Sequence, residues 1–321
     1  MEPPAVTPGT CPGNPVSDGE RAARAELTWL AAPGDQALGA FVRAAGEEQA
    51  MTLIRAGRLP RDAGLAVPGD ARRSVSRWHA ALGKVPSRRE VLDALEGRFR
   101  LLCPGDAEWP AGLDALGEAA PVALWVTGVL DLRFSCLRSV AVTGSRAATA
   151  YGSYLASELG AALASRGVTV ISGASFGIDA AAHRGALAAD GATIAVLPGG
   201  IDVPYPAAHA DLLQAVAAQG ALVSEAPPGI PAGRLRFEFR HRVIAALATG
   251  TVVVESAARG RALTAARFAH GLGRPVMAVP GPVTSDLSAG CHDLIRSGQA
   301  LLVTCAGDVV GTLTEAGCPV G

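Results

Sequence analysis

Four arginines close together in the second half of the chain are the residues best suited to bind an anion. They fall within nine residues and are Arg234, Arg236, Arg240 and Arg242. A guanidinium stays charged and offers a planar fork of N–H donors that matches phosphate oxygens. The same segment holds a single acid, Glu238. Because one local patch is enough to bind a phosphate backbone, the net charge of −1 does not exclude a nucleic-acid ligand.

Aromatic and imidazole side chains are interleaved with these arginines. Phe237 and Phe239 lie inside the cluster, and His241 stands between its last two arginines. Aromatic rings beside arginines suit the stacking of nucleobases next to phosphate contacts, and a histidine can donate or accept a hydrogen bond. Either phenylalanine could instead belong to the core, and for Phe239 the sequence favours neither interpretation. We expect the cluster to precede an apolar helix over residues 243–247.

The segment from Ser139 onward predicts the sheet that positions these residues. Short apolar runs alternate with alanine-rich helical segments, and the runs cover residues 140–142, 168–171, 193–197, 221–223, 251–254, 276–279 and 301–304. Near-continuous apolar strands separated by helices are typical of a parallel sheet covered on both faces. We therefore predict a doubly wound, mainly parallel α/β domain of the extended Rossmann-like type over residues 139–321, with about six or seven strands.

Glycine and polar residues follow nearly every predicted strand. Those that could contact an anion are Gly144, Ser145, Arg146, Ser172, Gly173, Arg261 and Thr264. Ligands of open α/β sheets bind at the carboxyl ends of the strands, and glycine turns bring backbone N–H groups close to an anion. Each glycine taken alone is better explained as a tight turn, whereas the whole set predicts a phosphate-bearing ligand.

Other polar residues near the strand ends have two interpretations. We expect Glu225 and Glu255 either to accept hydrogen bonds from backbone N–H groups or to orient an arginine of the cluster, and we favour the second. Asp179 and His183 are four residues apart on a predicted helix. A local pair or a capping role explains them better than catalysis does.

The first part of the chain differs in composition. Residues 1–19 are rich in proline, glycine and small polar residues, which favours a disordered leader. Residues 20–97 carry apolar side chains at helical spacing and predict a small helical domain, in which Asp35 is a suitable N-cap. Residues 98–138 are expected to connect the two domains and to pack on the core.

Composition and motifs exclude several classes of protein. The six cysteines are scattered without a C-x-x-C pair, so neither a zinc site nor a disulfide framework follows, and a reduced cytoplasmic compartment is expected. No run approaches the roughly 20 apolar residues of a membrane span. There is no G-x-G-x-x-G after the first strand and no Walker motif. We expect no metal, no cofactor and no membrane association.

Taken in order, these motifs resemble the DprA/Smf family of DNA-processing proteins. The matching strings cover residues 142–146, 172–174, 177–179, 195–202, 205–206, 224–225, 240–242, 253–255, 263–265 and 278–281. The resemblance runs from about residue 100 to residue 305 and is specific as a set. The helical part before it is similar to the SAM-like region that precedes this fold in family members.

The resemblance implies a non-enzymatic protein that binds single-stranded DNA with little sequence preference. It also implies a homodimer that protects incoming DNA and helps to load a RecA-type recombinase during natural transformation. By position, the phosphate-binding residues would be Arg146, Arg240 and Arg242. The donors around them would be Gly144, Ser145, Ser172, Gly173 and Thr264. Phe237 would be the stacking platform, with His241 and Arg261 beside it.

The sequence also departs from the family pattern. The usual F-P-x-R-N-R has Glu238 in place of proline and His241 in place of asparagine. The usual S-G-S-L-I-T-A begins with Arg259, Gly260 and Arg261 here, which exchanges hydroxyl donors for charge. Many members carry a C-terminal winged-helix domain, and we expect none in this sequence.

Two other classes of function are weighed against DNA binding. The first is a nucleotide-monophosphate hydrolase of the lysine-decarboxylase-like group, which shares a P-G-G turn with residues 198–200. That group needs Gly-Thr and a catalytic glutamate shortly after the turn, and residues 201–205 supply neither. The second is a nucleotide-sensing Rossmann module, which would need a closed base pocket that nothing in the sequence marks.

Overall fold

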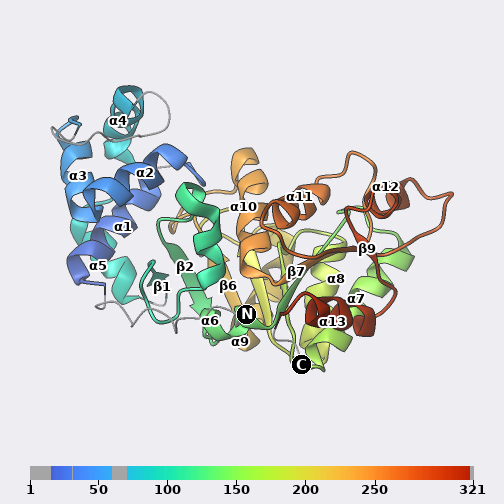
Figure 1. Cartoon of the computed structure of the whole chain (residues 1–321). Helices are drawn as coiled ribbons and strands as arrows, with labels where there is room; N and C mark the ends of the chain where they lie inside the picture. The colour runs from blue at the N-terminus through green and yellow to red at the C-terminus, as the bar shows by residue number, and fades with distance from the viewer. Residues whose placement is uncertain (1–15, 31, 60–70, 98, 319–321) are drawn as a thin grey trace, which may run out of the picture.

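The computed structural model describes residues 16–30, 32–59, 71–97 and 99–318, shown in Figure 1. Residues 1–15 of the predicted leader lie outside the described residues, and the first helix already begins at Asp18. The alternation of apolar runs and helical segments produces the predicted mixed α/β fold, with a mainly parallel sheet and a separate group of helices at the N-terminal side.

A nine-stranded sheet in the order β1-β2-β6-β5-β4-β3-β7-β8-β9 forms the centre of the molecule. Its strands are β1 (Arg100–Leu102), β2 (Leu124–Gly128), β3 (Ser139–Thr143), β4 (Thr169–Ser172), β5 (Thr193–Leu197), β6 (Ala221–Ser224), β7 (Gly250–Val253), β8 (Val276–Ala278) and β9 (Leu301–Leu302). The seven strands from β3 to β9 are all parallel to one another. By contrast, β2 is antiparallel to both of its neighbours, β1 and β6. The segment 98–138 thus supplies two strands to the sheet.

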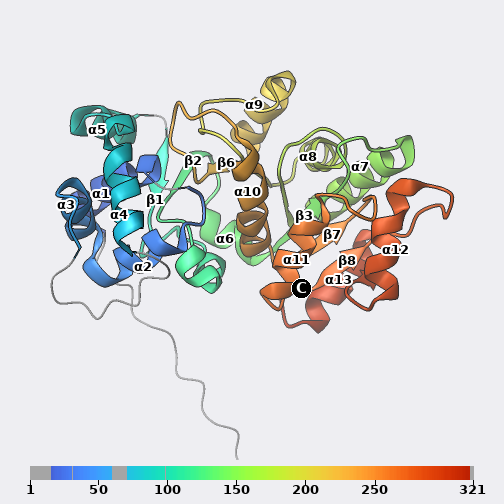
Figure 2. The same ribbon diagram turned by 90° about the horizontal axis from the view of Figure 1, so that it is seen from above.

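Helices cover both faces of the sheet, as the buried apolar strands require. They are α6 (Leu132–Leu137), α7 (Ala150–Ala164), α8 (Ile178–Ala188), α9 (Ala210–Gln219), α10 (Arg234–Leu247), α11 (Leu263–Gly271), α12 (Ala289–Arg296) and α13 (Ala306–Glu315). Short 3-10 turns lie at Leu82–Lys84, Ala111–Ala119, Ala207–His209 and Asp286–Ser288. Figure 2 shows α10 between the N-terminal helices and the α11–α12 side of the molecule.

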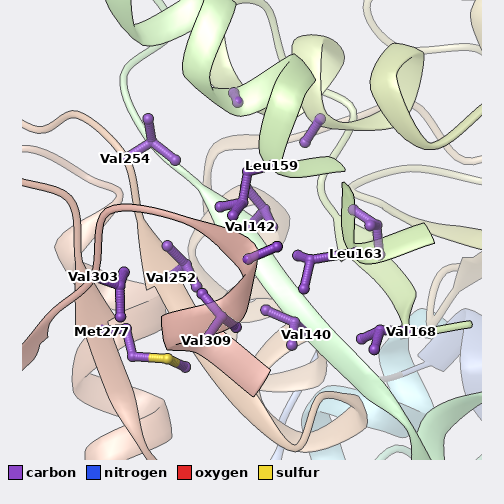
Figure 3. Packing of buried hydrophobic residues seen from close by; sticks show 14 of the residues in the cluster. Val140, Val142, Leu159, Leu163, Val168, Val252, Val254, Met277, Val303 and Val309 are labelled. Atoms are coloured by element: carbon purple, nitrogen blue, oxygen red, sulfur yellow. The ribbon is translucent and has the colours of Figure 1, made fainter. Parts of the chain in front are cut away.

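The main core lies between the sheet and helices α7, α8 and α13. Val142 and Val252 from adjacent strands pack there with Leu159 and Leu163 of α7 and Val309 of α13 (Figure 3). All five are at least nine-tenths buried. Each such side chain contributes about 1.5–3 kcal/mol relative to an exposed position, so this layer holds the strands in register.

The N-terminal helices form a core of their own. They are α1 (Asp18–Leu30), α2 (Gln36–Ala45), α3 (Glu47–Arg55), α4 (Ala71–Ala81) and α5 (Arg88–Glu96). Phe41 and Trp78 are buried in it with ring centroids 5.6 Å apart. The Asp35 carboxylate accepts hydrogen bonds from the N–H groups of Ala37 and Leu38, so it caps α2 as its side-chain chemistry predicts.

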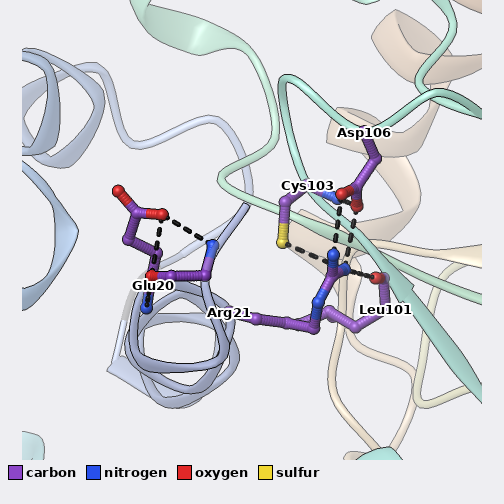
Figure 4. Close-up of polar contacts among 6 residues, drawn as sticks. Glu20, Arg21, Leu101, Cys103 and Asp106 are labelled. Carbon is purple, nitrogen blue, oxygen red and sulfur yellow. Dashed lines mark hydrogen bonds and ion pairs between the residues drawn. The ribbon is translucent and has the colours of Figure 1, made fainter. Parts of the chain in front are cut away.

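Polar contacts attach these helices to the edge of the sheet. The Arg21 guanidinium donates to the carbonyl oxygen of Leu101 and to both carboxylate oxygens of Asp106, at 2.6–2.9 Å (Figure 4). Trp29 of α1 packs edge-on against Trp125 of β2, with centroids 5.7 Å apart. A bidentate arginine–carboxylate pair fixes orientation as well as distance, so the helical region has a defined position on β1 and β2.

Within the described ranges, no helix is long and apolar enough to cross a membrane. A search of the same ranges finds no group of three or more histidine, cysteine or acidic side chains arranged to hold a metal ion.

Candidate nucleic-acid interface

The strand order reverses between β3 and β7, which makes this the topological switch point of the sheet. The chain runs from β3 through β4 and β5 to β6, then returns to place β7 on the other side of β3. The loops that follow β3 and β7 therefore separate, and a crevice opens between them at the carboxyl ends of the strands. A hollow of about 450 Å³ lies there, lined by Gly144, Ser145, Ser256 and Ala257 of these loops.

A second hollow of about 570 Å³ adjoins the first, between α10 and α11. Its lining residues are Arg146, Phe237, Glu238, Phe239, His241, Arg261, Thr264, Arg267 and Phe268. The two hollows share Arg146, His241 and Arg261. We call the combined depression the strand-end groove. It joins three exposed arginines to three phenylalanines.

Helix α10 explains why the arginine cluster does not form one patch. The helix begins at Arg234 and contains the whole cluster, whereas the sequence predicted that the cluster precedes a helix over 243–247. Residues two apart on a helix point about 200° from one another. Arg240 and Arg242 accordingly have different surroundings, while Arg234 is exposed and Arg236 faces the N-terminal helices near Gly34.

Arg240 forms part of the floor of the groove. It is only 4% exposed, and its guanidinium donates to the Gly173 carbonyl oxygen and to Ser175 Oγ, both at 2.7 Å. Its Nη2 lies 3.8 Å from a carboxylate oxygen of Asp179. Burial lowers the pKa of Arg240 to about 10, an effect that Asp179 partly offsets. This arginine therefore holds the loop after β4 against α10 and remains charged at neutral pH.

Arg242 lies outside the groove. It is 2% exposed and pairs with Glu225 at 2.5 Å, and the same carboxylate oxygen accepts from the Gly34 N–H at 3.2 Å. Glu225 thus orients an arginine, as we favoured. Glu255 instead accepts from the N–H and hydroxyl of Thr149, at 2.9 and 2.5 Å. Glu225 therefore matches the interpretation that a glutamate orients an arginine of the cluster, and Glu255 matches the interpretation that it accepts a hydrogen bond from a backbone N–H.

The glycine and serine residues of the turns after β3 and β4 make hydrogen bonds and close contacts with other residues of the protein at the end of the sheet. Ser172 Oγ donates to the Val142 carbonyl oxygen at 2.6 Å, and the Ser145 N–H donates to the Glu255 carbonyl oxygen at 2.7 Å. A Cβ on Gly173 would lie 2.6 Å from an Arg240 nitrogen. A Cβ on Gly144 would lie 2.5 Å from the Ile178 side chain. Both glycines are needed for close approach.

Arg146 is the exposed cation at the centre of the groove. Its guanidinium carbon lies 4.8 Å from the centroid of the Phe237 ring, and that of Arg240 lies 5.1 Å from the same centroid. Tyr205 meets Phe237 edge-on at 4.9 Å. Among the described residues Arg146 has no acidic partner. A cation–π contact therefore orients it while its N–H donors stay open to a ligand.

Helix α11 brings two further residues into the groove that sequence reasoning missed. Arg267 and Phe268 line it beside the predicted Arg261 and Thr264, and an Arg267 nitrogen donates to Thr264 Oγ1 at 3.2 Å. Residues three and four apart share one face of a helix. The spacing of Thr264, Arg267 and Phe268 was therefore the signal that could have found them.

His241 lies at the junction of the two hollows as a neutral side chain. It is buried, and its Nδ1 has no hydrogen-bond partner within the described residues. Burial, reinforced by nearby Arg240, lowers the pKa of His241 to about 3. At neutral pH it presents an uncharged imidazole to the groove, which suits a hydrogen bond to a base better than a charge contact to a phosphate.

Asp179 and His183 do not form the local pair that their spacing allowed. His183 Nδ1 lies 2.7 Å from Thr193 Oγ1, and burial lowers its pKa to about 3. Asp179 accepts from the Ser175 N–H at 3.2 Å, and burial raises its pKa. Phe239 is half-buried, lines the groove and also lies against Gly34 of the helical region.

Fold and groove together define a doubly wound α/β protein with a cationic, aromatic depression at the carboxyl ends of its strands. The sequence profile of the family described as "DNA recombination-mediator protein A" matches residues 100–314. The chain belongs to this family.

Individual relatives agree with this assignment. The chain is 45% identical over 296 residues to a DNA processing protein DprA of Mycobacterium tuberculosis, an alignment that covers 89% of this chain and 73% of that protein. It is 43% identical over 205 residues to protein Smf of Escherichia coli, covering 63% of this chain and 54% of that one.

Two solved structures are similar as well. DprA of Streptococcus pneumoniae superposes with a TM-score of 0.75 at 29% identity, covering 92% of this chain and 98% of that one. DprA of Helicobacter pylori, whose structure describes a single-stranded DNA binding mode, superposes with a TM-score of 0.61 at 25% identity, covering 68% and 97%.

Proposed function

We propose that this protein binds single-stranded DNA in the strand-end groove and catalyses no reaction on it. The observation that carries the proposal is the contact between the exposed Arg146 guanidinium and the Phe237 ring, with Arg261 just before the facing helix α11 and Arg267 within it. Phosphate-binding donors and base-stacking surfaces thus lie side by side, which is the combination that single strands require.

In this mechanism Arg146, Arg261 and Arg267 neutralise backbone phosphates. Bases stack on the Arg146–Phe237 pair and on Phe268, contributing about 1–3 kcal/mol per base. Every base has an aromatic face, and phosphates carry no sequence information. Binding is therefore expected to show little sequence preference, with the neutral His241 adding a hydrogen bond to a base edge. Arg240, Ser172 and Gly173 support the groove from beneath.

For the molecule in its cell we propose the wider role that family membership suggests. The bound strand would be shielded from degradation and presented to a RecA-type recombinase, with the protein acting as a homodimer in the cytoplasm during natural transformation. The expected readout is faster filament assembly by the recombinase on single-stranded DNA when this protein is present.

Fluorescence anisotropy with a labelled oligo-dT of about 4 nucleotides, which is short enough to occupy the groove alone, tests the groove directly. Three phosphate contacts predict a log–log salt slope of roughly −2, because each contact to a single strand contributes about −0.7. The double variant Arg146→Ala/Arg261→Ala should retain one contact and a slope of about −0.7.

The matched control removes two exposed arginines that do not line the groove, Arg133→Ala/Arg184→Ala. It should retain the wild-type slope because neither arginine contacts the strand. It is a matched control because it changes the net charge as much as the groove variant does. A groove variant that binds like the control would refute this site. Release of free adenine from AMP by the wild type would refute the non-enzymatic function.

A further inference from the structure

A third hollow of about 640 Å³ lies beyond the strand-end groove, between the start of α11 and α12. Three arginines line it, Arg259, Arg267 and Arg296. One of them, Arg267, also lines the strand-end groove, and Gly260 lines both this hollow and the crevice at the switch point. The depressions are therefore neighbours around the start of α11.

The charge of this hollow favours an extended anion. Its lining holds one carboxylate, Asp293, which pairs with Arg296 on the exposed surface of α12. Arg259 is exposed and has no acidic partner among the described residues. Since an exposed ion pair contributes only about 0–1 kcal/mol, a phosphate can replace Asp293 at Arg296 with little loss.

The hollow differs from the groove in one chemical respect. Besides the charged residues, its lining consists of alanine, glycine, leucine, serine and glutamine, and it contains no aromatic residue. A strand here can gain phosphate contacts but no stacking. The contribution of this hollow to the affinity for DNA must therefore depend on salt and on the length of the strand, and not on the identity of the bases.

We propose that bound single-stranded DNA continues from the strand-end groove past Arg267 into this hollow, where Arg259 and Arg296 bind the phosphates of further nucleotides. This inference rests on the proposed function and extends its binding track. It assigns a role to Arg259, which stands where a hydroxyl residue is usual in the family pattern.

The test compares oligo-dT of about 4 and about 16 nucleotides, which span the range of site sizes of single-strand binding domains. For the double variant Arg259→Ser/Arg296→Ala, binding of the short strand should equal wild type. Binding of the long strand should weaken, with a salt slope shallower by about 1.4 for two lost contacts. The unfolding midpoint in urea confirms that the variant is folded, as expected for two exposed side chains.

The outcomes separate this inference from the function on which it rests. If Arg259→Ser/Arg296→Ala binds the long strand as wild type does, the extended track is overturned. If Arg146→Ala/Arg261→Ala loses binding in the same experiment, the groove still stands as the binding site. If Arg259→Ser/Arg296→Ala binds the short and the long strand more weakly to the same degree, the extended track is also overturned, because Arg259 and Arg296 would then act on the groove itself. A wild type that binds neither length overturns both proposals.

Discussion

At the scale of residues, burial divides the arginines of this protein into two groups. Arg240 and Arg242 are within a few per cent of full burial and are bound by carbonyl, hydroxyl and carboxylate oxygens of the protein. Arg146, Arg261 and Arg267 are exposed in the groove. The first group stabilises the site and the second is available to a ligand, although the phosphate-binding arginines expected from the sequence, Arg146, Arg240 and Arg242, include members of both.

Replacing Arg240 should therefore lower the free energy of unfolding, and any effect on DNA binding should follow from that loss of stability. Arg240→Met leaves Asp179 buried without its cation and the Gly173 carbonyl oxygen without its donor, a loss of about 3–5 kcal/mol. Arg146→Ala should change stability by no more than about 0.5 kcal/mol. Urea unfolding distinguishes them. Wild-type stability combined with lost DNA binding in Arg240→Met would place this arginine among the ligand contacts instead.

At the scale of elements, the position of the groove depends on how closely α7 and α8 pack against each other. These helices follow β3 and β4, and the loops between those strands and the helices both line the hollow at the switch point. Small residues permit the contact, since a Cβ on Gly160 would lie 2.4 Å from the Ala182 carbonyl oxygen and one on Gly185 would lie 2.0 Å from that of Ser157. A rigid backbone carbonyl cannot move aside as a side-chain tip can.

Two glycine-to-alanine changes in helices should thus have opposite signs. Gly160→Ala is expected to destabilise by about 1–3 kcal/mol through overpacking. Gly311→Ala lies in α13 with no heavy atom within 4 Å of the added carbon, and should stabilise by about 0.5–1 kcal/mol because alanine favours the helix. Thermal unfolding measures both. A stabilising Gly160→Ala would show that α7 and α8 can separate without cost.

At the scale of the whole molecule, the sheet and the N-terminal helices are joined through buried polar contacts that reach the groove. Glu225 accepts from Arg242 of α10 and from the backbone of Gly34, and Phe239 of the groove lies against the same glycine. The helical region therefore supports α10 from the side opposite α11 (Figure 2). Both parts of the fold contribute to the shape of the binding surface.

Global stability should fall when the pH drops below about 6.5. The pKa values of His183 and His241 are lowered to about 3 by burial, so the folded protein keeps both neutral while the unfolded chain takes up protons below its pKa of about 6.5. The contribution of each is complete above that pH and is lost toward pH 3, by up to about 1.4 kcal/mol per pH unit.

Urea unfolding at pH values of about 7.5 and 5.5 tests this dependence. The His183→Asn variant should lose less stability on acidification than wild type. Asp179, whose pKa is raised, titrates in the opposite sense in both proteins, so the difference between them isolates the histidine. Identical pH dependence in the two proteins would contradict the neutral, buried state of His183.

The sequence by itself determined the fold class and the edge of the sheet that holds the site. Apolar runs of β-branched residues can be buried only between two helical layers, and polar residues after strands gather at one edge because parallel strands end together. The strands β1 and β2 escaped prediction because three to five residues in an irregular segment carry too little periodicity, and their pairing depends on the distant β6.

Only the tertiary structure decided which predicted residues face a ligand. Charge and spacing are the same for a buried and an exposed arginine, so Arg240 and Arg242 could not be separated from Arg146 until α10 was placed against the sheet and the helical region. Arg267 and Phe268 likewise became groove residues only when α11 was set opposite α10. Side-chain burial is a property of neighbouring elements, and local sequence does not contain it.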